Sequence, residues 1–359
     1  MKKPRVGIIF GGRSGEHEVS IASAASIFQH LDRTRYEAIP IRIEKSGRWL
    51  LGGSPQDALS TAAVLETGVT GALQPVEPSA VVSGDLDVVF PVLHGPYGED
   101  GTVQGLLELA NVPYVGAGVL GSAVGMDKAL MKTLFAASGF PIVPHLTVLR
   151  KEWVAHRPSI GARAANTLRF PMFVKPANLG SSVGISKVTS EGDFADAMEL
   201  AFQFDRKVVV EAAVPHAREI ECAVIGNDEP EASVPGEVIV THRDGFYSYG
   251  AKYVDPDGAT WKIPADIPQE TANRVRSLSV EAFRTLELAG MARVDFFLDG
   301  KAGALYLNEV NTIPGFTTIS MYPKMWEASG LSYAALLDRL IALALARHAD
   351  KQKLRTSIT

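Results

Sequence analysis

Over the first third of the chain, short apolar runs alternate with segments in which apolar residues recur at helical spacing. The short apolar runs, which predict strands, cover residues 5–10, 36–43, 87–93 and 113–115, and the segments with helical periodicity cover 18–31 and 102–110. Strands that alternate with helices predict a parallel sheet with helices packed on it. We therefore expect an α/β domain over residues 1–125.

The pattern is more mixed between residues 126 and 212. Helices are predicted over 126–138 and 191–202, and strands over 145–149, 172–175, 185–188 and 208–214. Residues 150–168 fit either a helix or a loop. This order of elements predicts a small central domain with a sheet of its own.

Strand patterns dominate the last third of the chain. The expected elements are antiparallel strands over 219–225 and 237–241, a helix over 268–289, a hairpin of 293–298 with 304–311, and a helix over 331–347. The predicted fold class is therefore α/β and α+β, because an antiparallel sheet with helices follows the parallel one. We expect this third domain over residues 213–347, followed by a polar tail over 348–359.

The composition is that of a globular protein. Of the 359 residues, 46% are hydrophobic and 21% are charged, and the net charge is −5. The sequence has no basic cluster typical of nucleic-acid binding and no apolar run of the length that crosses a membrane. The apolar run after the N-terminus is too short for a signal peptide. Cys222 is the only cysteine, so we expect a reducing, cytoplasmic environment.

The predicted hairpin of the third domain carries the clearest chemistry. Because side chains alternate faces along a strand, Arg293 and Asp295 share one face, and Glu309 and Asn311 do so on the returning strand. A turn centred near Ala302 places Asp295 opposite Glu309, with about 5 Å between cross-strand partners. Two carboxylates and an amide oxygen then converge, a ligand set that suits Mg²⁺ beside phosphates. The alternative is a solvated polar face on an edge hairpin.

A loop of small residues follows the predicted strand that ends at Lys175. The glycines and serines between Gly180 and Gly184 let backbone N–H groups and hydroxyls approach phosphate oxygens. Lys175 and Lys128 are cations at the end of an apolar strand and at the start of a helix, where an anionic partner is expected. A loop of this kind is by itself more often a flexible turn, so the phosphate hypothesis depends on the hairpin.

Other polar groups stand where predicted strands end. Residues 211–214 are positioned to form a hinge whose backbone meets an adenine edge, and Glu219 could accept hydrogen bonds from ribose hydroxyls. The glycine turn with Glu16 and the turn after His94 follow parallel strands, whose carboxyl ends bind ligands in such folds. Glu16 could pair there with the ammonium of a small zwitterion. Solvated carboxylates and a structural histidine are the alternatives.

Six short motifs occur in order along the chain. They are Gly11-Gly12-x-Ser14-x-Glu16-x-Glu18, His94-Gly95-x-x-Gly98-Glu99-Asp100-Gly101, Lys175-Pro176-x-x-x-Gly180-Ser181-Ser182, Arg218-Glu219-Ile220-Glu221, Ala251-Lys252-Tyr253 and Asn308-Glu309-x-Asn311-Thr312-x-Pro314-Gly315. In order and spacing this set resembles the signatures of D-alanine–D-alanine ligases.

The resemblance implies the ATP-grasp fold, with a Rossmann-like N-terminal domain, a small central domain, a C-terminal antiparallel-sheet domain, and ATP between the second and third. It implies ATP contacts with Lys128, Lys175, Glu211, Ala213, Val214 and Glu219. It also implies that two Mg²⁺ or Mn²⁺ ions are held by Asp295, Glu309 and Asn311. The remaining implied site residues are Glu16, His94, Ser181, Lys252, Tyr253, Arg293, Gly315 and Ser320.

The resemblance also implies roles for these remaining residues. Glu16 would bind the ammonium of the first D-alanine, with His94 near its carboxylate. Glu16, Ser181 and Tyr253 would form a hydrogen-bonded triad that closes a loop from which Lys252 reaches phosphate. Arg293 and the Gly315 backbone would form the oxyanion site. Ser320 would bind the carboxylate of the second D-alanine.

The implied reaction joins two D-alanine molecules through an acyl phosphate, with ATP as co-substrate and a homodimer as the usual assembly. A ligase that joins D-alanine to D-lactate is the nearest rival, and Tyr253 argues against it. Another carboxylate–amine ligase is a weaker rival. A nucleotide-binding regulatory module is the alternative from another class, which the full set of Lys175, Arg293 and the three metal ligands argues against.

Overall fold

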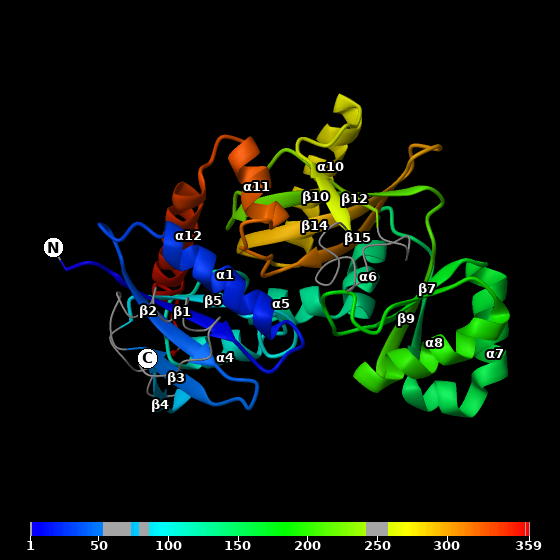
Figure 1. Ribbon diagram of the computed structural model, residues 1–359, viewed down its shortest axis with the longest axis horizontal. Helices are drawn as coiled ribbons and strands as arrows, with labels where there is room; N and C mark the ends of the chain where they lie inside the picture. Colours follow the sequence, from blue (N-terminus) through cyan, green and yellow to red (C-terminus); the bar gives the residue numbers. More distant parts are fainter. Residues whose placement is uncertain (1, 53–72, 79–85, 242–257, 356, 359) are drawn as a thin grey trace.

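The computed structural model describes residues 2–52, 73–78, 86–241, 258–355 and 357–358. Its strands form three sheets. In Figure 1 the N-terminal sheet lies at the left with the C-terminal helix, the second sheet lies at the right, and the third lies above and between them. Segments far apart in sequence therefore meet where the three sheets face one another.

The first sheet has the strand order β4–β3–β2–β1–β5. Its elements are β1 (Arg5–Gly11), α1 (His17–His30), β2 (Glu37–Ile43), β3 (Trp49–Gly52), β4 (Leu73–Val76), β5 (Val88–Val92) and α4 (Thr102–Leu109). The predicted parallel pairing of β1 with β2 and β5 is confirmed. The strand predicted over residues 113–115 is wrong in extent, because only Tyr114 makes a bridge to Val89.

The second sheet is antiparallel, in the order β6–β9–β7–β8. Its elements are β6 (His145–Leu149), α7 (Arg150–Leu168), β7 (Met172–Pro176), β8 (Ser186–Val188), α8 (Glu191–Phe204) and β9 (Lys207–Ala212). The ambiguous segment 150–168 is helical, with non-helical dihedral angles at His156 just before Pro158. Trp153 of α7 and Phe194 of α8 pack edge to face, with their ring centroids 5.9 Å apart, in the core of this domain.

The third sheet is antiparallel in the order β13–β12–β10–β14–β15, and β11 pairs with β10. Its elements are β10 (Ala217–Gly226), β11 (Glu231–Ala232), β12 (Gly236–Val240), β13 (Ala259–Lys262), α10 (Gln269–Thr285), β14 (Gly290–Asp299) and β15 (Leu305–Asn311). The predicted register is confirmed: Asp295 lies opposite Glu309, and Arg293 lies opposite Asn311. Helix α10 ends before the predicted residue 289, because the backbone turns to positive φ at Glu287.

The helix predicted over residues 126–138 is confirmed for most of its length, but its predicted start is wrong. The chain forms α5 (Val119–Met126) and α6 (Lys128–Ala137), which are separated by Asp127. Asp127 has an extended backbone, and its carboxylate accepts hydrogen bonds from the N–H groups of Ala129 and Leu130, as an N-cap residue does. This break places Lys128 at the first position of α6.

The C-terminal helices are α11 (Met321–Ala328) and α12 (Tyr333–Gln352). Helix α12 extends past the predicted end at residue 347, so the expected polar tail is partly helical. Its last turn is tied to the end of α4, where Lys351 pairs with Glu108 and Gln352 donates to Asn111. No single helix in the described segments is long and apolar enough to span a membrane. The pair α11–α12, bent by 105°, meets that criterion only together, and its apolar side chains belong to the core.

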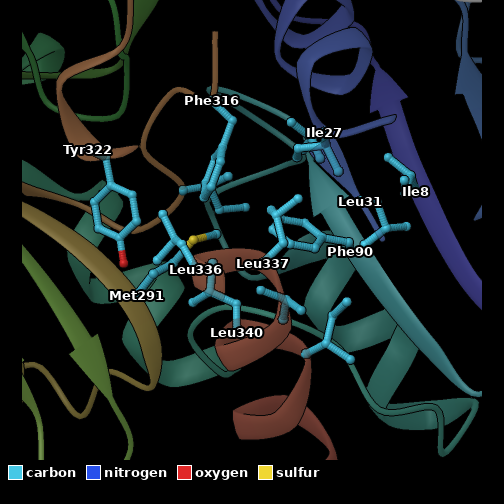
Figure 2. Packing of buried hydrophobic residues seen from close by; sticks show 14 of the residues in the cluster. Ile8, Ile27, Leu31, Phe90, Met291, Phe316, Tyr322, Leu336, Leu337 and Leu340 are labelled. Atoms are coloured by element: carbon cyan, nitrogen blue, oxygen red, sulfur yellow. The ribbon is translucent and has the colours of Figure 1, made fainter. Parts of the chain in front are cut away.

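A shared core lies between the first and third sheets. Figure 2 shows Phe90 of β5, Met291 of β14 and Leu336 of α12 around Phe316. The Phe316 ring lies 5.6 Å from the ring of Phe90 and 5.6 Å from that of Tyr322. The segment that carries Gly315 therefore ends on a buried apolar support.

Phe316→Ala tests this support. Removing a fully buried ring should lower the free energy of unfolding by about 3–5 kcal/mol, because both apolar burial and packing are lost. Leu109→Ala is the control, because that side chain is 91% exposed and should change stability by no more than about 0.5 kcal/mol. Urea unfolding of the two variants checks the difference, and equal effects would contradict the packing.

Candidate active site

A cleft of about 550 Å³ lies between the second and third sheets. Predicted site residues that line it are Lys175, Glu211, Ala213, Val214, Glu219, Arg293, Asp295 and Glu309. A smaller cavity shares Glu309 with it and is also lined by Lys128, Ser181 and Asn311. The structure thus brings together most of the predicted nucleotide and metal residues from separate parts of the chain.

The hairpin β14–β15 presents its polar face to this cleft. The Arg293 guanidinium donates two hydrogen bonds of 2.7 Å to the two oxygens of Asp295, and Asn311 Nδ2 donates to Asp295 Oδ2 at 2.9 Å. Arg293 Nε also lies 3.1 Å from Glu221 Oε2 on β10. Burial alone would lower the pKa of Arg293, but Asp295 and Glu221 raise it, so the guanidinium stays charged.

The donor set of the hairpin fits a divalent cation that arrives with phosphate. No group of three or more His, Cys, Asp or Glu side chains gathers into a metal site within the residues that the structure describes. The hairpin instead offers the carboxylates of Asp295 and Glu309 and the amide of Asn311, all hard oxygen ligands on adjacent strands. Three protein ligands do not complete the six-coordinate shell of Mg²⁺, so phosphate oxygens and water would supply the rest.

A buried carboxylate between two lysines forms the floor of the cleft. Glu211 Oε2 lies 2.7 Å from Lys175 Nζ, and Glu211 Oε1 lies 3.0 Å from Lys132 Nζ. Burial alone would raise the pKa of Glu211, but the two ammonium groups lower it to about 2. The Glu211 side chain is therefore ion-paired with two lysines, whereas the resemblance implies that it contacts adenine. The sequence signal for Lys132 is its spacing of four residues from Lys128, which puts both on one face of α6.

The N-terminal glycine turn meets the glycine–serine loop of the second sheet. Ser181 Oγ donates a hydrogen bond to Glu16 Oε1, so two of the three members of the implied triad are in contact. A Cβ atom at Gly180 would lie 2.6 Å from Glu16 Oε2, so a larger residue there would displace that carboxylate. The other predicted loop residues, Tyr253 and Lys252, lie outside the described residues.

His94 holds the segment before Gly315. Its Nδ1 lies 3.0 Å from the carbonyl oxygen of Ile313 and its Nε2 lies 3.3 Å from Ser23 Oγ. A nitrogen that faces a carbonyl must donate, so Nδ1 carries the proton of the neutral ring and Nε2 of that tautomer accepts from the serine. Burial lowers the pKa of His94, although Glu16 opposes the shift. Both ring nitrogens are thus used inside the protein.

Glu99 contacts the N–H group of the same residue, Ile313. Its Oε1 accepts from the Ile313 N–H at 3.1 Å and its Oε2 accepts from the Gly95 N–H at 2.8 Å. Burial and the nearby Glu16 carboxylate raise the pKa of Glu99 to about 8. Glu99 and His94 together therefore tie the third sheet to the turn after β5, a link that the sequence pattern does not reveal.

Gly315 and Ser320 lie against each other at the start of α11. A Cβ atom at Gly315 would lie 2.7 Å from Ser320 Oγ, which accepts a 2.9 Å hydrogen bond from the Thr317 N–H. Neither residue lines the 550 Å³ cleft. Gly315, one of the two predicted oxyanion residues, thus lies in the same turn as the predicted carboxylate-binding Ser320, close in sequence to Ile313, which His94 and Glu99 contact; Arg293, the other predicted oxyanion residue, lies on β14 and lines the cleft.

His94→Asn tests the neutral histidine. Because the folded pKa is lowered, the unfolded chain gains a proton first as the pH falls below 6.5, and the wild type then loses stability. Asparagine still donates to Ile313 but does not titrate. At pH 7.5 the variant should be less stable than the wild type by about 1–2 kcal/mol. This gap should shrink toward pH 5.5 in urea unfolding. A gap that grows would show a raised pKa in the folded protein and a flat gap would show no shift, and either result would contradict the lowered pKa.

Comparison with known protein families agrees with the geometry. The family model for the D-ala D-ala ligase N-terminus matches residues 5–117, and that for the D-ala D-ala ligase C-terminus matches residues 134–342. A D-alanine–D-alanine ligase of Solibacter usitatus is 51% identical over 353 residues, which cover 98% of this chain and 99% of the relative.

Solved structures agree as well. The D-alanine–D-alanine ligase of Coxiella burnetii superposes with a TM-score of 0.83 at 38% identity and covers 98% of both chains. A D-Ala:D-Ser ligase of Enterococcus faecalis superposes with a TM-score of 0.81 at 36% identity and covers 96% of this chain and 100% of its own. Both the sequence and the fold therefore place this chain in the D-alanine–D-alanine ligase family, with its ATP-grasp fold.

Proposed function

We propose that this chain joins two D-alanine molecules into D-alanyl-D-alanine, a peptidoglycan precursor, with conversion of ATP to ADP and phosphate. One observation carries the proposal: the cleft between the second and third sheets holds both a cationic floor at Lys175 and the acidic hairpin of Asp295 and Glu309. Such a cleft can neutralise a polyphosphate from two sides. Family membership supplies the reaction that uses it.

ATP would occupy this cleft. Lys175 and Lys128 would contact its phosphates, the backbone of Ala213 and Val214 would meet adenine, and Glu219 would accept from ribose hydroxyls. Two Mg²⁺ or Mn²⁺ ions would be held by Asp295, Glu309 and Asn311. When bound, such ions neutralise the negative charge that phosphoryl transfer redistributes.

The chemistry follows from the poor reactivity of a bare carboxylate. The carboxylate of the first D-alanine attacks the γ-phosphorus of ATP and becomes an acyl phosphate, while ADP leaves. The amine of the second D-alanine, after losing a proton, attacks the acyl carbon and expels phosphate. Glu16 would hold the ammonium of the first D-alanine. Ser181 donates a hydrogen bond to the Glu16 carboxylate and so orients it. His94 would act indirectly, because its hydrogen bond to the carbonyl oxygen of Ile313 holds the segment that leads to Gly315.

Arg293 and the Gly315 N–H would stabilise the oxyanion of the second step, and Ser320 would bind the carboxylate of the second D-alanine. The loop with Lys252 and Tyr253 would cover the site and exclude water, which otherwise hydrolyses acyl phosphates. We also propose a cytoplasmic location, where ATP and D-alanine are available, and a homodimeric assembly.

Substrate choice is tested by measuring phosphate release from ATP and Mg²⁺ with D-alanine, L-alanine, D-alanine plus D-lactate, or D-alanine plus D-serine. We expect release with D-alanine alone, none with L-alanine, and D-alanyl-D-alanine as the main product of both mixtures by mass spectrometry. A main product that contains D-lactate or D-serine would assign this chain to a different ligase of the same fold. Release with L-alanine would overturn the stereochemical part of the proposal.

Asp295→Asn and Glu309→Gln test the metal residues. Each change keeps the side-chain shape and removes the charge, so kcat should fall at least about a hundredfold in protein that thermal unfolding shows to be folded, although each variant also weakens an ion pair, with Arg293 or with Lys128. Glu327→Gln on α11 is the matched control, because that carboxylate is exposed and away from the cleft. Near-normal turnover in both hairpin variants would reject the assignment.

A further inference from the structure

Lys132 is a buried cation next to the cleft that no step of the proposed reaction uses. Its side chain is 1% exposed, and it is absent from the lining of the cleft, whereas Glu211 and Lys175 both line it. Lys132 Nζ lies 3.0 Å from Glu211 Oε1 and donates to the carbonyl oxygen of Asn308 at 3.1 Å. Lys132 is therefore placed to act on a ligand in the cleft by its charge and through Glu211 and β15, not by direct contact.

The charge balance of this cluster shows what Lys132 changes. Burial and the charge of Lys175 lower the pKa of Lys132, while the adjoining Glu211 carboxylate opposes the shift. With both lysines protonated, Glu211 is one carboxylate between two ammonium groups, and the three side chains together carry one positive charge. Without Lys132, Glu211 and Lys175 would form a neutral pair. In a buried setting, where charges are weakly screened, that difference acts strongly on an anion in the cleft.

The neighbouring ion pairs do not supply this positive charge. Lys128 Nζ lies 3.3 Å from Glu309 Oε2, which balances one cation with one carboxylate. Arg293 contacts two carboxylates, those of Asp295 and Glu221, so that group carries a negative charge. Loss of Lys132 would therefore make the combined charge of these linked groups negative, which disfavours a polyphosphate.

We propose that Lys132 is a positioning residue for nucleotide binding, which neutralises Glu211 so that the charge of Lys175 remains available to the ATP phosphates. The proposal rests on the proposed function for the identity of the ligand. The competing explanation is a purely structural one, in which Lys132 only ties α6 to β9 and to the carbonyl of Asn308 by hydrogen bonds. The two explanations differ in whether the charge or the hydrogen bonds of Lys132 matter.

Two variants separate charge from hydrogen bonding. Lys132→Gln keeps a donor for Glu211 and Asn308 but has no charge, whereas Lys132→Met has neither. We expect both to raise the Kd of Mg·ADP about tenfold or more, the size expected for one unit charge near a phosphate at an effective dielectric of about 20. The Kd of AMP should change less than about threefold, because AMP lacks the outer phosphate. Calorimetric titration with ADP and AMP gives both values.

A second change at Glu211 tests the charge balance directly. Lys132→Gln combined with Glu211→Gln restores one positive charge at Lys175, so the ratio of ADP to AMP affinity should return to within about threefold of the wild type. Comparing ADP with AMP cancels any change in adenine binding. Lys353→Gln, which removes an exposed cation paired with Asp350, is the control and should leave the ratio unchanged.

Each result decides the question. A Lys132→Gln variant with wild-type affinity for ADP, an equal loss for ADP and AMP, or a double variant as weak as the single one would overturn the proposal. Thermal unfolding of every variant shows whether it is folded, and the glutamine variant keeps the test valid if the methionine variant is not. If the wild-type protein binds ADP but makes no D-alanyl-D-alanine, the proposed function is rejected. The role of Lys132 in nucleotide binding is then still decided by the ADP and AMP affinities.

Discussion

The pairing of buried charges in one cleft is the constraint on which the rest of the structure depends. Withdrawing an ammonium or a carboxylate from water costs several kcal/mol per ion, so each needs a partner nearby. Glu211 meets this need for Lys132 and Lys175, and Asp295 meets it for Arg293. Glu211 and Lys175 lie on neighbouring strands of the second sheet, whereas Arg293 and Asp295 lie on one strand of the third. Lys132 of α6 and Lys175 also donate hydrogen bonds to Asn308 on β15, so the cleft forms only when the second and third sheets are in place.

The N-terminal sheet joins this arrangement through uncharged contacts as well as charged ones. His94 and Glu99 contact the two backbone polar groups of Ile313, its carbonyl oxygen and its N–H, and Phe316 then packs into the core shared with α12. Because Ile313 precedes Gly315, the segment proposed to hold the oxyanion is supported by the first sheet, the third sheet and α12 together. Ser181 links Glu16 to the second sheet in the same way. Catalytic geometry here depends on contacts between sheets more than on any single loop.

The sequence pattern predicted the features that depend on local period. The register that places Asp295 opposite Glu309 follows from the two-residue repeat of a strand and the position of one turn. Family motifs predicted the pairing of Glu16 with Ser181, which no local pattern contains. The boundaries proposed for the three domains and the roles of the ligand-contacting residues stay predictions.

Features that depend on tertiary contacts were missed. The break at Asp127 needs only one residue of extended backbone, which hydrophobic periodicity does not register. The extra turns of α12 are held by Glu108 and Asn111, which are distant in sequence. Lys132 looks like an ordinary helical lysine until the fold places Glu211 against it. In each case the deciding feature is either a contact with a distant part of the chain or the backbone conformation of a single residue.

The central claim is that the acidic hairpin and the cationic floor form one site for a nucleotide and its metal. Mn²⁺ binding measured by electron paramagnetic resonance, with and without ADP, tests it most directly. Because the hairpin supplies too few ligands alone, Mn²⁺ should bind weakly to the protein and much more tightly once ADP is present, and Asp295→Asn should abolish that gain. Equal Mn²⁺ affinity with and without ADP would contradict the claim, as would a gain that survives the loss of the Asp295 charge.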